Sequence, residues 1–207
     1  SENPSYNKLE VLYNKKPCYP RMINNICNFP DRRHFINQLI FKEYKNGRKI
    51  IILSDRRDYL NLTLKDINSI YPNTARLYVG GMKPDELRES QEKDIILGTF
   101  SMASEGMDIP KLNTIILASP KSDVVQSVGR IMREKPNKRK FHPLIIDICD
   151  VHENLYFFQK QCDKRISFYK KQNYQITKFH INGSQSKIIK SKQKKHKPVY
   201  QMEECLL

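Results

Sequence analysis

The stretch at residues 97–110, LGTFSMASEGMDIP, joins two apolar segments through a loop of small and polar residues. One apolar segment ends at Leu97, and the next begins at Thr114. A simple connection needs only about two to five residues and no acid at a fixed place. The loop is therefore longer and more polar than a reversal of the chain requires.

Short apolar segments alternate with amphipathic segments along most of the chain. We expect strands at residues 49–53, 76–79, 94–99, 114–118 and 143–148, and helices at residues 31–44, 59–70, from 84 onward, 122–133 and 155–171. This alternation predicts an α/β fold, a parallel sheet with helices on both faces. Ligands bind such sheets at the carboxyl ends of the strands, so the loops after Leu53, Val79 and Thr99 are candidate functional loops.

The composition divides the chain into three parts. Residues 1–30 contain four prolines, which interrupt any long helix, so we expect an irregular N-terminal segment with room for a short hairpin. Residues 31–182 are expected to form the folded domain. Residues 183–207 have six lysines between Lys187 and Lys197 and few apolar groups, which predicts a flexible basic tail.

The charge and the cysteines narrow the possible partners and compartments. The formal net charge of +15 favours a polyanionic partner such as nucleic acid, because bound lysines and arginines release counterions from phosphates. A merely soluble basic protein is the alternative. No apolar run approaches the roughly 18 residues of a membrane span. The five cysteines are scattered without zinc-binding spacing, which predicts reduced thiols and an intracellular, reducing environment.

The segment at residues 122–133, SDVVQSVGRIMR, has the pattern of a two-faced helix. Its apolar stripe comprises Val124, Val125, Val128, Ile131 and Met132. Its polar face comprises Gln126, Arg130 and Arg133. Gly129 lies between the faces, costs about 1 kcal/mol of helix propensity against alanine, and suggests a close backbone approach. Taken alone, such a polar face is more often simply exposed to solvent.

Three segments in this order resemble the second RecA-like domain of superfamily 2 helicases. ILSDRR at residues 52–57 is similar to motif IV, GTFSMASEGMDIP at 98–110 to motif V, and QSVGRIMR at 126–133 to motif VI. Residues 147–176 further resemble helicases of large cytoplasmic DNA viruses, namely the poxvirus-type transcript-release helicases and their asfarvirus relatives. The resemblance implies a RecA-like helicase C-terminal domain, which the basic tail predicted from the composition would follow.

The resemblance also implies roles for individual residues. Arg130 and Arg133 would be arginine fingers that reach the γ-phosphate of ATP, and Gln126 would contact the γ-phosphate or orient water. Nucleotide contacts are expected at Gly106 and Asp108. Nucleic-acid contacts are expected at Ser54, Arg56, Gly81, Lys83 and Thr99. A conformationally demanding turn capped by an aspartate is the alternative for the motif V loop.

The sequence contains neither a GxxxxGK[ST] phosphate loop nor a DExx box. We therefore expect ATP with Mg²⁺ to be held mainly by an N-terminal RecA-like domain of the same protein that is absent here, with residues 1–30 as the linker from it. The chain alone is predicted to be inactive. The predicted function is the second motor domain of an ATP-dependent helicase, viral and linked to transcription or DNA processing, in the host cytoplasm or virion. The alternative is a non-hydrolysing nucleic-acid-binding module with a RecA-like fold.

Overall fold

The computed structural model describes residues 3–104, 107–109, 111–182, 185–190 and 201–206. The helices are α1 (Pro4–Asn7), α2 (Tyr19–Asn28), α3 (Pro30–Lys45), α4 (Arg57–Ile70), α5 (Pro84–Glu92), α6 (Phe100–Ser104), α7 (Val125–Arg130) and α8 (Tyr156–Lys171), with the 3-10 turns η1 (Pro136–Lys138) and η2 (Glu153–Leu155). The strands are β1 (Ile50–Leu53), β2 (Ala75–Tyr78), β3 (Ile95–Gly98), β4 (Thr114–Leu117), β5 (Leu144–Cys149), β6 (Gln175–Asn182), β7 (Gln185–Lys190) and β8 (Gln201–Leu206).

The strands of the described residues form one sheet in the order β2-β3-β1-β4-β5-β8-β6-β7. The five strands from β2 to β5 are all parallel, with β1 in their centre, where Ile50 pairs with Ile95 on one side and Thr114 on the other. All residues of β1, β3 and β4 are buried, which explains their unbroken apolar character. The predicted parallel α/β sheet is confirmed.

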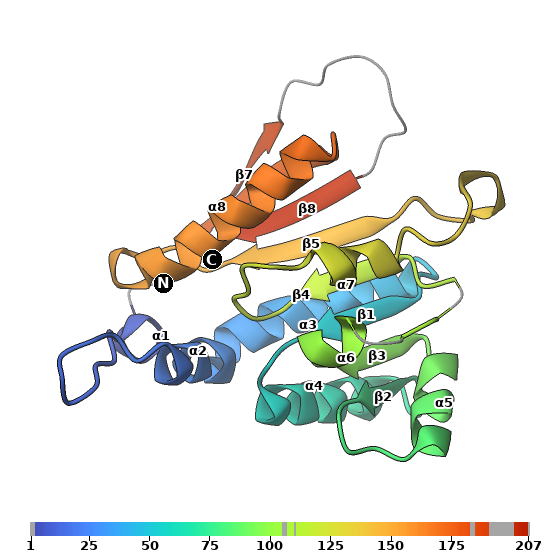
Figure 1. Cartoon of the computed structure of the whole chain (residues 1–207), viewed down its shortest axis with the longest axis horizontal. Helices are drawn as coiled ribbons and strands as arrows, with labels where there is room; N and C mark the ends of the chain where they lie inside the picture. Colours follow the sequence, from blue (N-terminus) through green and yellow to red (C-terminus); the bar gives the residue numbers. More distant parts are fainter. Residues whose placement is uncertain (1–2, 105–106, 110, 183–184, 191–200, 207) are drawn as a thin grey trace.

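Helices cover both faces of this parallel sheet (Figure 1). Successive side chains of a strand point to opposite faces, so Ile50 and Ile52 belong to one core and Ile51 and Leu53 to the other. α3 and α4 pack on the first core, and α6, α7 and α8 on the second. The prediction of helices on both faces is therefore also confirmed.

The N-terminal segment is more helical than predicted. Pro20 and Pro30 lie in the first turns of α2 and α3, where a missing N–H costs no helical hydrogen bond, so they start these helices rather than interrupt them. Val11 and Pro17 form an antiparallel bridge between α1 and α2. Helices α1 and α2 pack against the start of α8 in a third apolar cluster. Its buried members are Tyr6, Met22, Ile26, Leu155 and Phe158.

The C-terminal region differs from the predicted basic tail in part of its length. β8 pairs in parallel with β5 and β6, and β7 pairs antiparallel with β6. Two strands, at Gln185–Lys190 and Gln201–Leu206, thus fall within the region predicted to be flexible. Residues 183–184, 191–200 and 207 lie outside the described residues, and for them the tail stays a prediction.

Two of the cysteines are not reduced, contrary to prediction. Cys149 of β5 and Cys162 of α8 form a disulfide, with Cα atoms 6.0 Å apart. The residues are 13 positions apart in the sequence and become neighbours only because α8 packs on β5. Cys18 and Cys27 are free and buried.

Candidate nucleotide and nucleic-acid site

The carboxyl ends of β1, β3 and β4 are tied together by backbone hydrogen bonds. The N–H of Ser54 donates to the carbonyl of Gly98 at 3.1 Å, and the N–H of Ala118 donates to the carbonyl of Leu53 at 2.9 Å. Gly98 permits close packing here, since an added Cβ would lie 3.1 Å from the carbonyl oxygen of Tyr78. The loops that carry motifs IV, V and VI therefore start from one rigid edge of the sheet.

Arg130 joins motif VI to motif V. Its Nε donates to the carbonyl of Ala103 at 2.8 Å, and its Nη2 donates to the carbonyl of Ser104. Both carbonyls belong to the last turn of α6, whose carbonyl groups have no helical partner and carry the negative end of the helix dipole. Arg130 of motif VI thus caps α6, the short helix at the start of the motif V loop.

Arg133 contacts the same loop further along. Its Nη1 donates to the carbonyl of Met107 at 3.1 Å and to Oδ1 of Asp108 at 2.7 Å. The side chain of Arg133 is 47% exposed and that of Asp108 is 77% exposed. Exposed ion pairs contribute at most about 1 kcal/mol, so Arg133 can exchange Asp108 for another anion. Gly106, the other predicted nucleotide contact, lies outside the described residues.

The apolar stripe of α7 is only partly as predicted. Val124, Val128 and Ile131 are almost fully buried. Val125, however, is 52% exposed, whereas Ser127 is buried. The helix spans Val125–Arg130 rather than residues 122–133, so Arg133 lies beyond it. Its buried side is rotated toward Ser127, which removes Val125 from the core.

The outward side of α7 is open to solvent. Gln126 is exposed and Arg130 is half-buried, and Arg133, which follows the helix, is also exposed. Gly129 is exposed as well, and an added Cβ would meet nothing within 4 Å. The close backbone approach predicted for Gly129 is not found among the described residues.

A buried ion pair behind α7 was missed by sequence reasoning. Nε and Nη2 of Arg165, from α8, donate to the carboxylate of Asp147 at 2.8 and 2.7 Å. Nη1 of Arg165 donates to the carbonyl of Lys121 in the connection from β4 to α7. The sequence does contain an indication of this ion pair, because an acid inside an apolar strand such as LIIDIC requires a buried partner.

A second buried pair lies on the opposite face. Nε and Nη2 of Arg32, from α3, donate to Oδ1 and Oδ2 of Asp150 at 2.6 and 2.9 Å, and Nη1 donates to the carbonyl of Ala118 at 2.9 Å. Burial lowers the pKa of the Arg32 guanidinium, but the Asp150 carboxylate raises it by more, and the net pKa lies above the usual value. The hydroxyl of Tyr6 also donates to Oδ1 of Asp150 at 2.7 Å.

Potential metal ligands gather at one place within the described ranges. The ligand atoms of Asp147, Cys149 and Cys162 lie within 4.8 Å of one another. The two sulfurs are bonded to each other and the carboxylate accepts from Arg165. All three side chains therefore already interact with other groups of the protein.

The predicted nucleic-acid contacts of motifs IV and V differ in accessibility. Ser54 is fully buried, so its hydroxyl does not reach the surface; instead it accepts from the N–H of Arg56 at 3.1 Å. Because Ser54 is buried, a direct contact between its side chain and nucleic acid is not supported. Its hydrogen bond instead helps to position Arg56. Thr99 is partly exposed, and its hydroxyl lies 3.1 Å from that of Ser101.

The two remaining candidates lie in the loop between β2 and α5. Gly81 is exposed with φ +88°, a conformation that favours glycine. Lys83 is exposed at the start of α5, where its N–H donates to Oε2 of Glu86 at 2.8 Å. Nη2 of Arg57 donates to the carbonyl of Gly80 at 2.6 Å and so links this loop to motif IV.

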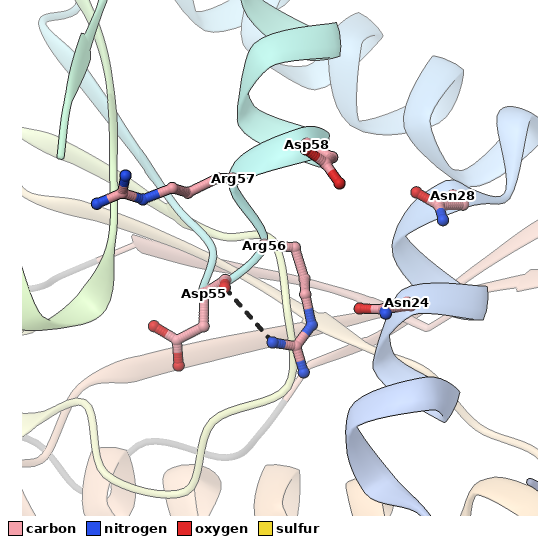
Figure 2. Close-up of a pocket in the computed structure, with 6 residues that line it drawn as sticks. All are labelled: Asn24, Asn28, Asp55, Arg56, Arg57 and Asp58. Atoms are coloured by element: carbon pink, nitrogen blue, oxygen red, sulfur yellow. Dashed lines mark hydrogen bonds between the residues drawn. The ribbon is translucent and has the colours of Figure 1, made fainter. Parts of the chain in front are cut away.

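A pocket of about 280 Å³ opens beside the motif IV loop. One wall is α2, and the other is the start of α4 with the loop before it (Figure 2). The lining residues are Asn24, Asn28, Asp55, Arg56, Arg57 and Asp58. Sequence reasoning singled out only Arg56 among them, because the residues of α2 reach this edge only through the packing of the N-terminal segment.

The parallel sheet, with motif VI bound to the motif V loop at its carboxyl edge, defines a RecA-like helicase motor domain. Residues 31–135, half of the chain, match the family described as helicase conserved C-terminal domain, and the chain belongs to this family. The predicted resemblance to a superfamily 2 helicase C-terminal domain is confirmed.

The relatives are viral. The chain is 40% identical over 172 residues to L396 of Acanthamoeba polyphaga mimivirus, in a match that covers 82% of this chain and 32% of that protein. It is 28% identical over 141 residues to QP509L of African swine fever virus, covering 68% and 26%. Both relatives are named as ATP-dependent RNA helicases. The chain spans about a third or less of their length.

Solved structures agree on the fold. T4 UvsW superposes with a TM-score of 0.59 at 21% identity, over 75% of this chain and 35% of that one. The helicase MrfA, bound to DNA and AMPPNP, superposes with a TM-score of 0.50 at 21% identity, over 65% of this chain and 20% of that one.

Within the described ranges, no helix combines the length and apolar character needed to cross a membrane.

Proposed function

We propose that this chain is the second motor domain of an ATP-dependent nucleic-acid helicase or translocase, viral and linked to transcription or DNA processing. The observation that carries the proposal is the alignment of Arg130 and Arg133 along the motif V loop. Arg130, the last residue of α7, holds the end of α6, and Arg133, three residues beyond the helix, donates to Asp108. Two arginines of motif VI thus face a loop whose residues are expected to contact a nucleotide.

On the nucleotide side, this domain would supply positively charged arginine side chains, and the first motor domain would hold ATP with Mg²⁺. Mg²⁺ would neutralise charge on the phosphates during phosphoryl transfer. Arg133 would leave Asp108 for the γ-phosphate, because its planar fork binds phosphate oxygens in pairs and stays charged. Gln126, one turn before Arg130, would contact the γ-phosphate or orient water.

On the nucleic-acid side, Arg56, Gly81, Lys83 and Thr99 would follow the strand along the carboxyl edge of the sheet. Arg56 and Lys83 supply charge, and the Gly81 backbone and the Thr99 hydroxyl suit contacts to phosphate oxygens. The net charge of +15 supports a polyanionic partner. Ser54 would act indirectly, through its hydrogen bond to Arg56.

One observation favours the alternative of a non-hydrolysing binding module. Two donors of Arg130 are already used by the backbone carbonyls of Ala103 and Ser104, as in a purely structural role. Under that alternative, Arg130 stabilises the motif V loop, and neither Arg130 nor Arg133 affects turnover.

Arg133→Lys in the longer helicase tests the motor assignment. The lysine keeps the charge and loses the fork, so kcat for ATP should fall by about 10³ or more, with little change in KM. Steady-state ATPase assays at saturating nucleic acid measure this effect. Arg88→Lys is the matched control, because Arg88 is exposed on α5 and pairs with Asp85. Near-normal turnover in both Arg133→Lys and Arg130→Ala would favour the binding module.

A further inference from the structure

Helix α2 adds a wall to the edge that carries motif IV. It lies outside residues 31–135, the part of the chain that matches the helicase family. Met22 and Ile26 anchor it in the N-terminal cluster, and its outward residues Asn24 and Asn28 line the pocket with Arg56 and Asp58. The pocket therefore combines a family element with one that the family match does not include.

Two of the six lining residues are engaged elsewhere. The carboxylate of Asp55 binds Nζ of Lys121 at 2.9 Å, and Arg57 points away from α2 and donates to the carbonyl of Gly80. The other four side chains come from α2 on one side and from the motif IV loop and α4 on the other (Figure 2). These four are Asn24, Asn28, Arg56 and Asp58.

Arg56 has donors that the chain does not satisfy well. Its Nε is buried and makes no hydrogen bond within the described part of the chain. Its Nη1 and Nη2 make only long contacts, at 3.5 Å to the carbonyl of Asp55 and 3.4 Å to that of Pro20 in α2. A buried donor without a partner is costly, so an incoming acceptor would bind Arg56 favourably.

The other lining groups require a ligand with donors too. Asp58 can only accept hydrogen bonds when ionised, and the amides of Asn24 and Asn28 can both donate and accept. A bare phosphodiester offers acceptors alone and is repelled by Asp58. A nucleotide offers phosphate oxygens together with the N–H groups of its base or the hydroxyl of its sugar.

We propose that this pocket binds one nucleotide unit of a nucleic-acid strand, with the phosphate on Arg56 and the base or sugar on Asn24, Asn28 and Asp58. The inference rests on the proposed function, in which the strand runs along this edge of the sheet. Helix α2 would then be a specificity element added to the nucleic-acid track by the N-terminal segment.

Fluorescence anisotropy with labelled single-stranded RNA and DNA 20-mers at low salt tests the proposal. Asn24→Ala/Asn28→Ala should raise the Kd for at least one of the two probes by about tenfold, since two net hydrogen bonds are lost. Asn137→Ala, the same change in η1 beyond the amino end of β5, should leave Kd unchanged. A wild-type Kd for the double variant, with an unchanged melting temperature, would overturn the proposal that this pocket binds a nucleotide unit.

Asp58→Asn separates a nucleotide from a bare phosphate. Loss of the acceptor charge should weaken binding severalfold if the carboxylate accepts from a base or sugar. Tighter binding would mean that Asp58 merely repels phosphate, and would overturn the assignment. Displacement of the 20-mer by an equal concentration of a nucleoside monophosphate would also overturn it, because the site would then take free nucleotides.

The same variants distinguish this inference from the motor assignment. In the longer helicase, Asn24→Ala/Asn28→Ala should raise the nucleic-acid concentration that gives half-maximal ATPase while kcat stays unchanged. Normal turnover by Arg133→Lys would remove the motor role and leave the binding result intact. An unchanged half-maximal concentration in the double variant would remove the pocket and leave the motor role intact.

Discussion

Arg32 and Arg165 hold the same connection from opposite faces of the sheet. Arg32 donates to the carbonyl of Ala118, and Arg165 donates to the carbonyl of Lys121, so the chain from β4 to α7 is fixed at two points. Each arginine is itself held by an aspartate, Arg165 by Asp147 within β5 and Arg32 by Asp150 directly after it. The position of motif VI relative to motif V therefore depends on two buried ion pairs that belong to neither motif.

Arg165→Met should destabilise the domain strongly. It leaves the carboxylate of Asp147 buried without its cation, and breaking a buried pair in this way costs about 3–5 kcal/mol. Chemical denaturation of this chain measures the loss. Asp147→Leu/Arg165→Met removes both charges and should recover much of the stability. If the double variant is no more stable than Arg165→Met, the buried charge is not the source of the loss.

Gly129→Ala should stabilise this chain by about 0.5–1 kcal/mol. Alanine has the higher helix propensity, and the structure leaves open space around the added Cβ. Thermal melting at neutral pH measures the gain. A lower melting temperature would show that α7 is packed more closely than the structure has it. A gain in stability with a loss of ATPase in the longer helicase would show that glycine serves a contact with the first motor domain.

Val128→Asp and Val125→Asp should differ sharply in effect. Val128 is 1% exposed and Val125 is 52% exposed. A carboxylate at the buried position has no partner and should cost at least about 3 kcal/mol, whereas the exposed position should tolerate it within about 0.5 kcal/mol. Urea titrations of the two variants test the observed rotation of α7. Equal losses would mean that the stripe predicted from the sequence is the correct one.

Tyr6 should make the domain sensitive to alkali. Burial raises the pKa of its hydroxyl, and Asp150 raises it further, above the ordinary value near 10. Above about pH 10 the unfolded chain loses this proton while the folded chain keeps it, so the free energy of unfolding falls by about 1.4 kcal/mol per pH unit. Below that pH the contribution is fully present.

Tyr6→Phe removes the titrating group and should flatten this dependence by one proton. Unfolding by denaturant at several pH values between about 9 and 11.5, a range that spans the ordinary tyrosine pKa, compares the two proteins. Parallel curves for wild type and variant would mean that the tyrosine ionises equally in both states.

The sequence alone was enough for the central architecture. The segment Ile50–Leu53 and its counterparts are short, unbroken and apolar, which only a strand buried on both faces explains well at this length. The order of motifs IV, V and VI around those strands predicted the carboxyl edge as the functional one. Local pattern sufficed because both features depend on neighbours along the chain.

The sequence misjudged features that depend on rotation and packing. A helical pattern does not say where the helix begins, and the start of α7 at Val125 turned that side chain outward and Ser127 inward. There the contacts of the folded chain outweigh the local preference. Pro20 differs, because a proline in the first turn of a helix costs no hydrogen bond and is compatible with α2.

Tertiary structure alone decided which distant groups meet. Arg32 and Asp150 are 118 residues apart, and Arg56 and Pro20 are 36 apart. No spacing rule connects such pairs, because each depends on how helices from either end of the chain pack on the sheet. The sequence thus determined the sheet and its motifs, and the packing of α2, α3 and α8 decided what surrounds them.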